Sequence, residues 1–301
     1  MILRNPNLKK EIRDELEYLN SKYFEFDIPV PFKEGLILYP IETRYYDEFV
    51  RVSSCFTMDK NETAEGLMTT HLGYLINKME DKETGQFYTR FLARALELIF
   101  HVKGGILCEC GHFLSYEEFL KIVQAGKAEC PECHSTNLTE TIRYINEQDT
   151  KKKKLIVNGI EINSKDFDRL RQIVIYQNFP DYQDDSWVDP EVRADQKLKQ
   201  EILAKQGSGG SATLEQKIVA VSSQSSYKFN EIYDMPMRKF IILLQMIDNV
   251  ITYQCDRTGL MSGMVTMKKP LEHLLYKPQK SMYGTATTAE AYKGEIAKAN
   301  G

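Results

Sequence analysis

The stretch LCECGHFLSYEEFLKIVQAGKAECPECHSTN, residues 107–137, decides how this chain is organised, because it contains four of the six cysteines. They form two close pairs, Cys108-x-Cys110 and Cys130-x-x-Cys133. Four thiolates in two such pairs supply the tetrahedral sulfur shell that Zn²⁺ prefers. The sequence therefore predicts a four-cysteine zinc site, and the alternatives are buried thiols or a disulfide.

The predicted zinc is structural. A catalytic zinc usually keeps three protein ligands and leaves one position open for water, whereas four cysteines close the shell. The chain has no H-E-x-x-H sequence and no H-x-E partner for its P-C-x-x-C sequence. His112 and His134 each follow a cysteine pair. They are alternative ligands if one cysteine is not used, or else exposed polar residues beside the metal.

A short helix is expected between the two cysteine pairs. Ser115 and Glu118 form the capping-box pattern that begins a helix, and Phe119, Leu120 and Val123 give it an apolar side. Folding of such a segment is linked to metal binding, which can contribute on the order of 10 kcal/mol.

Length and charge exclude several classes of protein. The chain has 301 residues, a formal net charge of −4 and a pI near 5.9, so it has no global basic field for nucleic acid. Its cysteines do not form a secreted disulfide framework, and Cys55 and Cys255, in apolar surroundings, are expected to be buried thiols. No signal peptide and no apolar run of membrane-spanning length is found. We expect a soluble protein of intracellular origin.

Hydrophobic periodicity predicts a mixed α+β fold that is mainly helical, with short β elements around the cysteines, a β-hairpin and a helical C-terminal region. Helices are expected at 7–23, 43–55, 65–79, 84–101, 164–177, 189–206, from 213 onward and at 236–253. Residues 24–32 are expected to be extended, with strands at 35–41 and 141–145 and a hairpin at 155–162 that turns at Asn158-Gly159.

The predicted helices and strands divide the chain into three regions. Residues 1–146 form an N-terminal helical domain that carries the zinc-ribbon-like insert at 107–137. Residues 147–206 contain the hairpin and two helices, and residues 207–301 form a helical C-terminal domain with a flexible tail. The Gly-Ser-rich run at 207–211 is the linker between the last two regions.

The most apolar predicted helix is Pro236–Tyr253. One face carries six apolar residues: Met237, Phe240, Ile241, Leu244, Ile247 and Ile251. Further apolar residues widen that face beyond a surface stripe, so we expect a core helix or a subunit contact. The polar tail after Pro278 is expected to order on a partner.

Signs of catalysis are missing from the sequence. His71, His101 and His273 lie beside apolar residues, without the Ser, Cys or Asp pattern of a triad. Asp184-Asp185 resembles a metal-binding pair, but the aromatic residues around it favour a docking loop. The basic run Lys151–Lys154 is either a phosphate contact or a solvated loop. We expect no enzyme.

Several short segments resemble the tail and baseplate assembly proteins of tailed bacteriophages. Segments similar to the T-even-type baseplate assembly family are 29–35, 38–41, 45–49 and Cys108-Glu-Cys110-Gly111-His112, the last one residue shorter than the family's C-x-x-C-G-H. Segments similar to tail assembly proteins of phages of Gram-positive hosts are 232–240 and 261–265.

The resemblance implies a non-enzymatic protein of phage tail or baseplate morphogenesis, or a virion structural protein. Its partners would be other tail or baseplate proteins or a second copy of itself, with no nucleic acid and no membrane. It would act in the host cytoplasm during assembly or remain in the virion. The alternative functions are a zinc-ribbon nucleic-acid-binding or transcription-related protein and, third, a metal-dependent enzyme.

Overall fold

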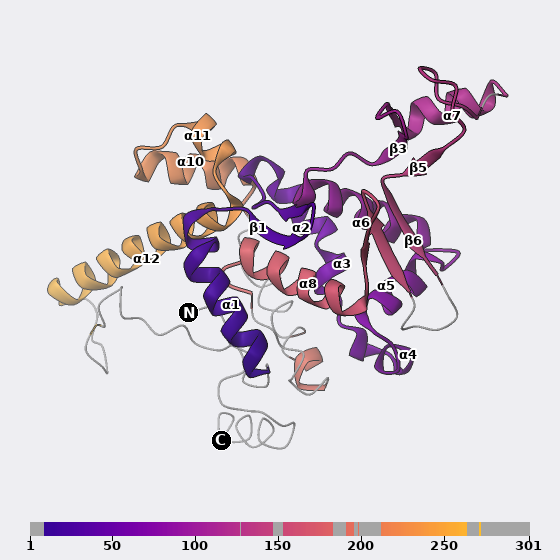
Figure 1. Ribbon diagram of the computed structural model, residues 1–301. Coiled ribbons are helices and arrows are strands. Elements are labelled where there is room, and N and C mark those ends of the chain that lie inside the picture. Colours follow the sequence, from indigo (N-terminus) through magenta and orange to yellow (C-terminus); the bar gives the residue numbers. More distant parts are fainter. Residues whose placement is uncertain are drawn as a thin grey trace. The chain divides into compact units, whose positions relative to one another are not determined.

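The computed structural model describes residues 9–126, 128–146, 153–182, 191–195, 198, 212–263 and 271 (Figure 1). This part of the chain is α+β and mainly helical, with small antiparallel sheets. The predicted fold class is confirmed at this level.

The helices are α1 (Lys10–Lys22), α2 (Tyr46–Val52), α3 (Ser54–Thr57), α4 (Ala64–Leu67), α5 (His71–Met79), α6 (Gly85–Phe100), α7 (Tyr116–Gln124), α8 (Ser164–Asn178), α10 (Leu214–Gln224), α11 (Phe229–Asp234) and α12 (Met237–Met261). Three 3₁₀ turns are η1 (Phe24–Phe26), η2 (Thr43–Tyr45) and η3 (Lys60–Glu62). The strands are β1 (Val30–Lys33), β2 (Leu36–Leu38), β3 (Gly105–Cys108), β4 (Phe113–Ser115), β5 (Leu138–Glu140), β6 (Ile142–Ile145), β7 (Lys154–Val157) and β8 (Ile160–Ile162).

The chain divides into two compact units. One comprises residues 18–41 and 45–178, and the other comprises 1–17, 42–44 and 179–301. The sequence-based boundaries at 146 and 206 fall next to or within segments outside the described ranges, so the three-region division stays a prediction. The polar tail after Pro278, the linker at 207–211 and most of the helix predicted at 189–206 also lie outside those ranges.

The first unit has a helical core. Helix α5 packs against α6 and α8, and α3 packs against the same two helices. The fully buried side chains here include Phe56, Leu72, Leu75, Ile76, Leu92, Leu96, Ile99, Phe167 and Leu170. Burial of these large apolar groups, each contributing about 1.5–3 kcal/mol, holds the helices together.

A three-stranded antiparallel sheet in the order β6-β7-β8 belongs to the same unit. Its β7–β8 hairpin turns at Asn158 and Gly159, which both have positive φ values of 49° and 80°. Positive φ at both central residues defines the type I′ turn that the Asn-Gly pair predicts. Among the strands that the structure describes, none pairs with the other side of β6.

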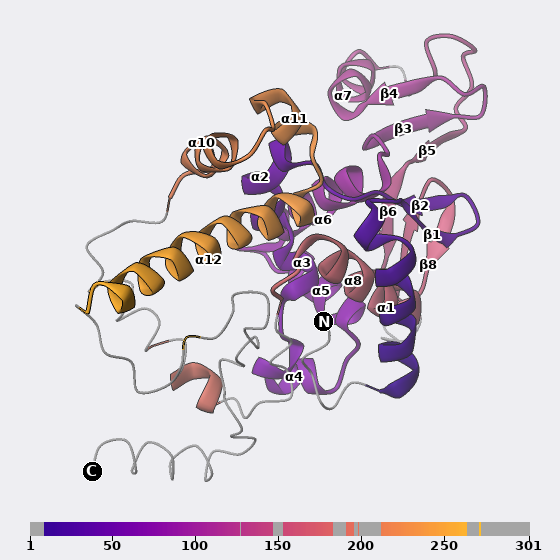
Figure 2. The ribbon, with the colours of Figure 1, turned by 90° about the vertical axis from the view of Figure 1, so that its left-hand side faces the viewer.

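The segment that the sequence singled out forms a small ribbon, residues 105–141. Its sheet has the order β4-β3-β5 with α7 beside it (Figure 2). The buried Thr141 links the two ends of the ribbon by hydrogen bonds. Its Oγ1 donates to the Lys103 carbonyl at 2.8 Å and accepts from the Gly105 N–H at 3.0 Å. The predicted capping box of Ser115 and Glu118 is present at the start of α7.

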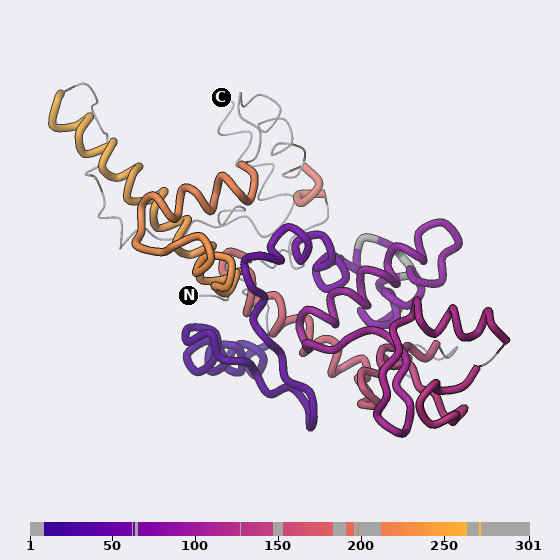
Figure 3. The backbone as a smooth tube through the Cα atoms, turned by 90° about the horizontal axis from the view of Figure 1, so that it is seen from above, coloured from indigo at the N-terminus to yellow at the C-terminus, as the bar shows by residue number. Residues whose placement is uncertain are grey.

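The second unit contains α10, α11 and α12. Ile218, Val221, Ile232, Met237 and Phe240 are its buried apolar residues in these helices. Helix α12 contacts α10 near its start, and its C-terminal part then diverges from α10 (Figure 2, Figure 3).

Several expectations about burial and secondary structure in this chain are wrong. The helix expected at 43–55 is divided into η2, α2 and α3. Cys255 is exposed on α12, although Cys55 is buried as expected. Residues 24–26 form η1 instead of an extended segment, and Asp27 follows in the left-handed region with φ 57°. Within the described ranges, no helix combines the length and apolar character that a membrane span requires.

Candidate metal centre

Two tight turns of the ribbon carry the four cysteines. Cys108 ends β3, and its N–H donates to the His112 carbonyl at 2.9 Å while its carbonyl accepts from the Gly111 N–H at 2.9 Å. Gly111 has φ 87°, which a residue without a side chain adopts at little cost. In the second turn the Cys130 N–H donates to Ser135 and its carbonyl accepts from His134. Both turns therefore fold sharply around the sulfur atoms.

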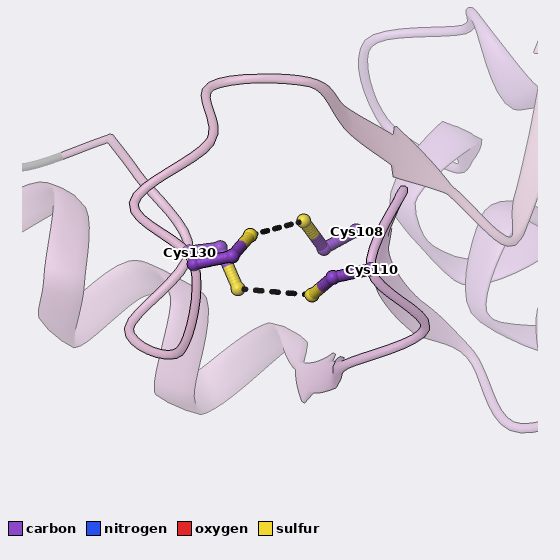
Figure 4. A group of neighbouring side chains, drawn as sticks. Cys108, Cys110 and Cys130 are labelled. Carbon is purple, nitrogen blue, oxygen red and sulfur yellow. Dashed lines mark hydrogen bonds between the residues drawn. The ribbon is translucent and has the colours of Figure 1, made fainter.

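The four sulfur atoms lie within 4.8 Å of one another. The Sγ atoms of Cys108 and Cys133 are 3.4 Å apart, and those of Cys110 and Cys130 are 3.8 Å apart (Figure 4). Four sulfurs at the usual zinc bond length of about 2.3 Å form a tetrahedron with edges of about 3.8 Å. A disulfide requires about 2.05 Å, so none of the four is bonded to another.

A polar side chain joins the two turns on the outside of the cluster. Glu109 lies between the first pair of cysteines, and its carboxylate accepts from Ser135 Oγ at 2.7 Å and from Asn137 Nδ2 at 2.9 Å. These bonds fix the spacing of the turns and so help to hold the four sulfurs in place.

The thiols strongly influence one another's ionisation. Burial raises the pKa of the Cys130 thiol, but N–H donors from Cys133 and Glu132 and neighbouring thiols lower that pKa to about 6. A backbone donor from Ser135 lowers the pKa of Cys133, but hydrogen bonds with the other thiols raise it to about 12. The Cys130 thiol therefore has a low pKa and the Cys133 thiol has a high pKa. A bound divalent cation would favour the thiolate form of both residues.

The two histidines beside the cysteines are not members of the cluster. Within the described ranges, the group that could hold a metal ion consists of Cys108, Cys110, Cys130 and Cys133. His134 is mostly exposed, with its Nδ1 atom 3.8 Å from Glu129. The four residues predicted from the sequence are therefore brought together, and four soft sulfur donors suit zinc or iron rather than magnesium or calcium.

Comparison of the chain with protein-family models, with curated proteins and with solved structures finds no match in any of the three. Any account of the chain's function therefore starts from its own residues.

Outside the ribbon, the basic run and the acidic pair gain little support as sites. Lys153 is buried and donates to Asn77 Oδ1, and Lys154 pairs with Glu161, while Lys151 and Lys152 lie outside the described ranges. Asp184 and Asp185 also lie outside them. The interpretation of the whole run as a solvated loop is wrong for Lys153.

A cavity that sequence reasoning did not predict lies between α6 and β6, with a volume of about 820 Å³. Its lining comes from α5, α6, β6, β7 and the ribbon. No local pattern signals such a space, because it depends on how elements distant in the sequence pack together.

Proposed function

We propose that the chain is a non-enzymatic protein-binding factor. In this proposal a structural zinc ion closes the ribbon, and α12 binds another protein. The observation that carries the binding role is the surface of α12, where the large apolar residues Ile242, Met246, Ile251 and Met261 are exposed.

Most apolar side chains of α12 are not buried by the described part of the chain. The 25 residues of this helix include only three buried side chains, Met237, Arg238 and Phe240, all in the first turn. Ile251 is 46% exposed and Met261 is 79% exposed. Ile242 and Met246 lie one turn apart on the same side of the helix, and adjoining exposed apolar residues typically mark protein-binding surfaces. Of the two expected roles for this helix, a subunit contact is therefore better supported than a core helix.

The zinc part of the proposal rests on the sulfur geometry. Four thiolates around one zinc ion would leave no open position for water or substrate, which suits a structural rather than a catalytic ion. The free energy of metal binding would stabilise a ribbon that buries few side chains of its own, since α7 has no buried residue.

The charge of the ribbon argues against the alternative of nucleic-acid binding. Between residues 105 and 141 there are six glutamates and two lysines. Phosphate contacts depend on clustered Lys and Arg side chains, so an acidic ribbon would repel a nucleic acid. Assembly of a phage tail or baseplate, which the sequence resemblance implies, remains the setting we propose for the protein–protein contact.

The α12 surface can be tested with a paired substitution. Ile242→Glu with Met246→Glu places two charges on exposed apolar positions, so the core of the unit should be unaffected. We expect this variant to lose the proteins that co-purify with the tagged wild-type chain, as measured by quantitative mass spectrometry of pull-downs from producing or infected cells.

The matched control is Thr252→Glu with Gln254→Glu, which adds the same charge at exposed polar positions of the same helix. This control should retain the partners. Equal recovery of the same partners by the Ile242/Met246 variant, with an unchanged circular dichroism spectrum, would refute the role of α12.

A further inference from the structure

We propose that the free edge of β6 is a second binding site, which takes an extended segment of a partner protein as an added β-strand. The ligand is a peptide with alternating apolar residues and at least one carboxylate. This proposal uses no residue of α12 and does not depend on the function proposed above.

The ladder of the sheet shows which backbone groups of β6 are free. The Asn158 N–H donates to the Thr141 carbonyl at 2.7 Å, so Thr141 faces β7. Hydrogen-bonded and non-hydrogen-bonded pairs alternate along antiparallel strands. Arg143 therefore also faces β7, and the backbone groups of Ile142 and Tyr144 point to the side without a neighbouring strand.

One contact agrees with this alternation. The Tyr116 hydroxyl lies 3.4 Å from the Ile142 carbonyl, on the side away from β7. Within the described part of the chain, the N–H and C=O of Tyr144 are then the central donor and acceptor of this edge. Strand edges without a partner strand pair readily with an extended chain.

The cavity of about 820 Å³ provides space beside that edge. Ile142, Arg143, Tyr144 and Asn146 of the β6 segment line it, together with residues of α6. Most of the lining is apolar, with Met79, Leu92, Ala93, Ile142 and Leu155 contributing. An added strand would hydrogen-bond to β6 and direct alternate side chains into this lining, since side chains alternate along a strand.

The lining contains three arginines and three glutamates, and two of the arginines are available to a carboxylate on the ligand. Arg94 is already engaged, with Nε 2.7 Å from Glu48 and Nη1 2.9 Å from Glu97. Arg90 and Arg143 also line the cavity, are exposed, and form no ion pair within the described ranges. Glu80 lies near the ammonium group of Lys153. The negative charge of Glu140 lies beside Tyr116, so a ligand carboxylate would have to bind at Arg90 and Arg143, away from Glu140.

A helix or a small anion fits these features less well. A helix has no free backbone groups along its length to pair with Tyr144, and a small anion could engage the arginines only. An extended peptide could pair with the backbone of Tyr144, place apolar side chains against the lining and bind the arginines through a carboxylate.

The test starts from a library of random linear peptides, selected against the immobilised full-length chain. Enriched peptides are then synthesised with a fluorophore, and binding is measured by anisotropy. Tyr144→Pro removes the edge N–H without removing a bond to β7, and edge strands tolerate proline. We expect this change to weaken binding by about tenfold or more, as loss of main-chain hydrogen bonds predicts.

Two further variants make the result decisive. Glu161→Pro places proline at the outward-facing position of β8, on the opposite edge of the same sheet, and should leave binding unchanged. Arg90→Glu with Arg143→Glu changes two exposed side chains that the core does not use, and should weaken binding of carboxylate-bearing peptides even if Tyr144→Pro fails to fold.

Three outcomes would overturn the proposal. The first is a selection that enriches no peptide. The second is equal binding of the enriched peptides to the wild type and to the Arg90/Arg143 variant. The third is a wild-type dimer in sedimentation velocity that Tyr144→Pro dissociates, because a second copy would then be the occupant of the edge.

Discussion

At the scale of single residues, His71 shows how burial and a charged partner compete. It lies half-buried at the start of α5, with Nδ1 2.9 Å from Asp168 Oδ1. Burial lowers the pKa of His71 below its ordinary value of 6.5, and Arg171 and Lys60 act in the same direction, whereas Asp168 raises it. The net effect is a lowered pKa, so the folded protein favours the neutral ring.

This lowered pKa makes stability depend on pH in a defined direction. The unfolded chain binds the His71 proton more readily than the folded chain, so the stabilisation is fully present above pH 6.5 and is lost as pH falls below it. We expect the free energy of unfolding to fall more between about pH 8 and about pH 5.5 in the wild type than in His71→Gln. Urea denaturation at both pH values measures the difference, and an equal fall in both proteins would contradict it.

Site residues could be predicted from the sequence where the residues that form the site lie close together in the chain. The four cysteines were predicted together because each pair lies within a few residues and metal geometry relates the pairs. The pairing of His71 with Asp168 could not be predicted, because it depends on the packing of α5 against α8. Cys255 was misjudged because its immediate neighbours Gln254 and Asp256 are polar and it lies on an exposed side of α12.

At the scale of elements, two helices with the same cap provide a comparison. Ser115 begins α7 in the ribbon and Thr213 begins α10 in the other unit, and both form complete capping boxes. Loss of such a cap typically costs about 1 kcal/mol of helix stability. Only the first helix belongs to the segment that contains the cysteines.

We therefore predict that Ser115→Ala weakens zinc affinity about fivefold, because folding of the ribbon and metal binding are linked. Thr213→Ala should leave zinc affinity unchanged although it removes an equivalent cap. Competition with a chromophoric chelator measures both affinities. Equal zinc affinities in the two variants would show that α7 does not contribute to the metal centre.

Turns and helix starts that depend on neighbouring residues were predicted correctly from the sequence. Features that depend on contacts between distant elements were not. The capping box of Ser115 and Glu118 and the Asn158-Gly159 turn each depend on a few adjacent residues. The helix expected at 65–79 is instead α4 and α5, because Thr70 caps α5 by accepting from the Gly73 N–H at 3.0 Å. The exposure of α12 and the cavity beside β6 had no sequence signal, since both depend on which neighbours pack there.

At the scale of the whole molecule, the two compact units are proposed to have separate roles. One contains the cysteine ribbon and the free edge of β6, and the other contains α12. The metal is proposed to stabilise the ribbon only, and neither binding surface includes a cysteine ligand. Removing the metal site should therefore be distinguishable from damage to α12.

The most direct test of the central claim is native mass spectrometry of the full-length chain, purified without added chelator. We predict one zinc ion per chain in the wild type and in Cys255→Ser, and no zinc in Cys130→Ser with Cys133→Ser. A wild-type chain that carries no metal, or a double-serine variant that keeps its zinc, would contradict the account.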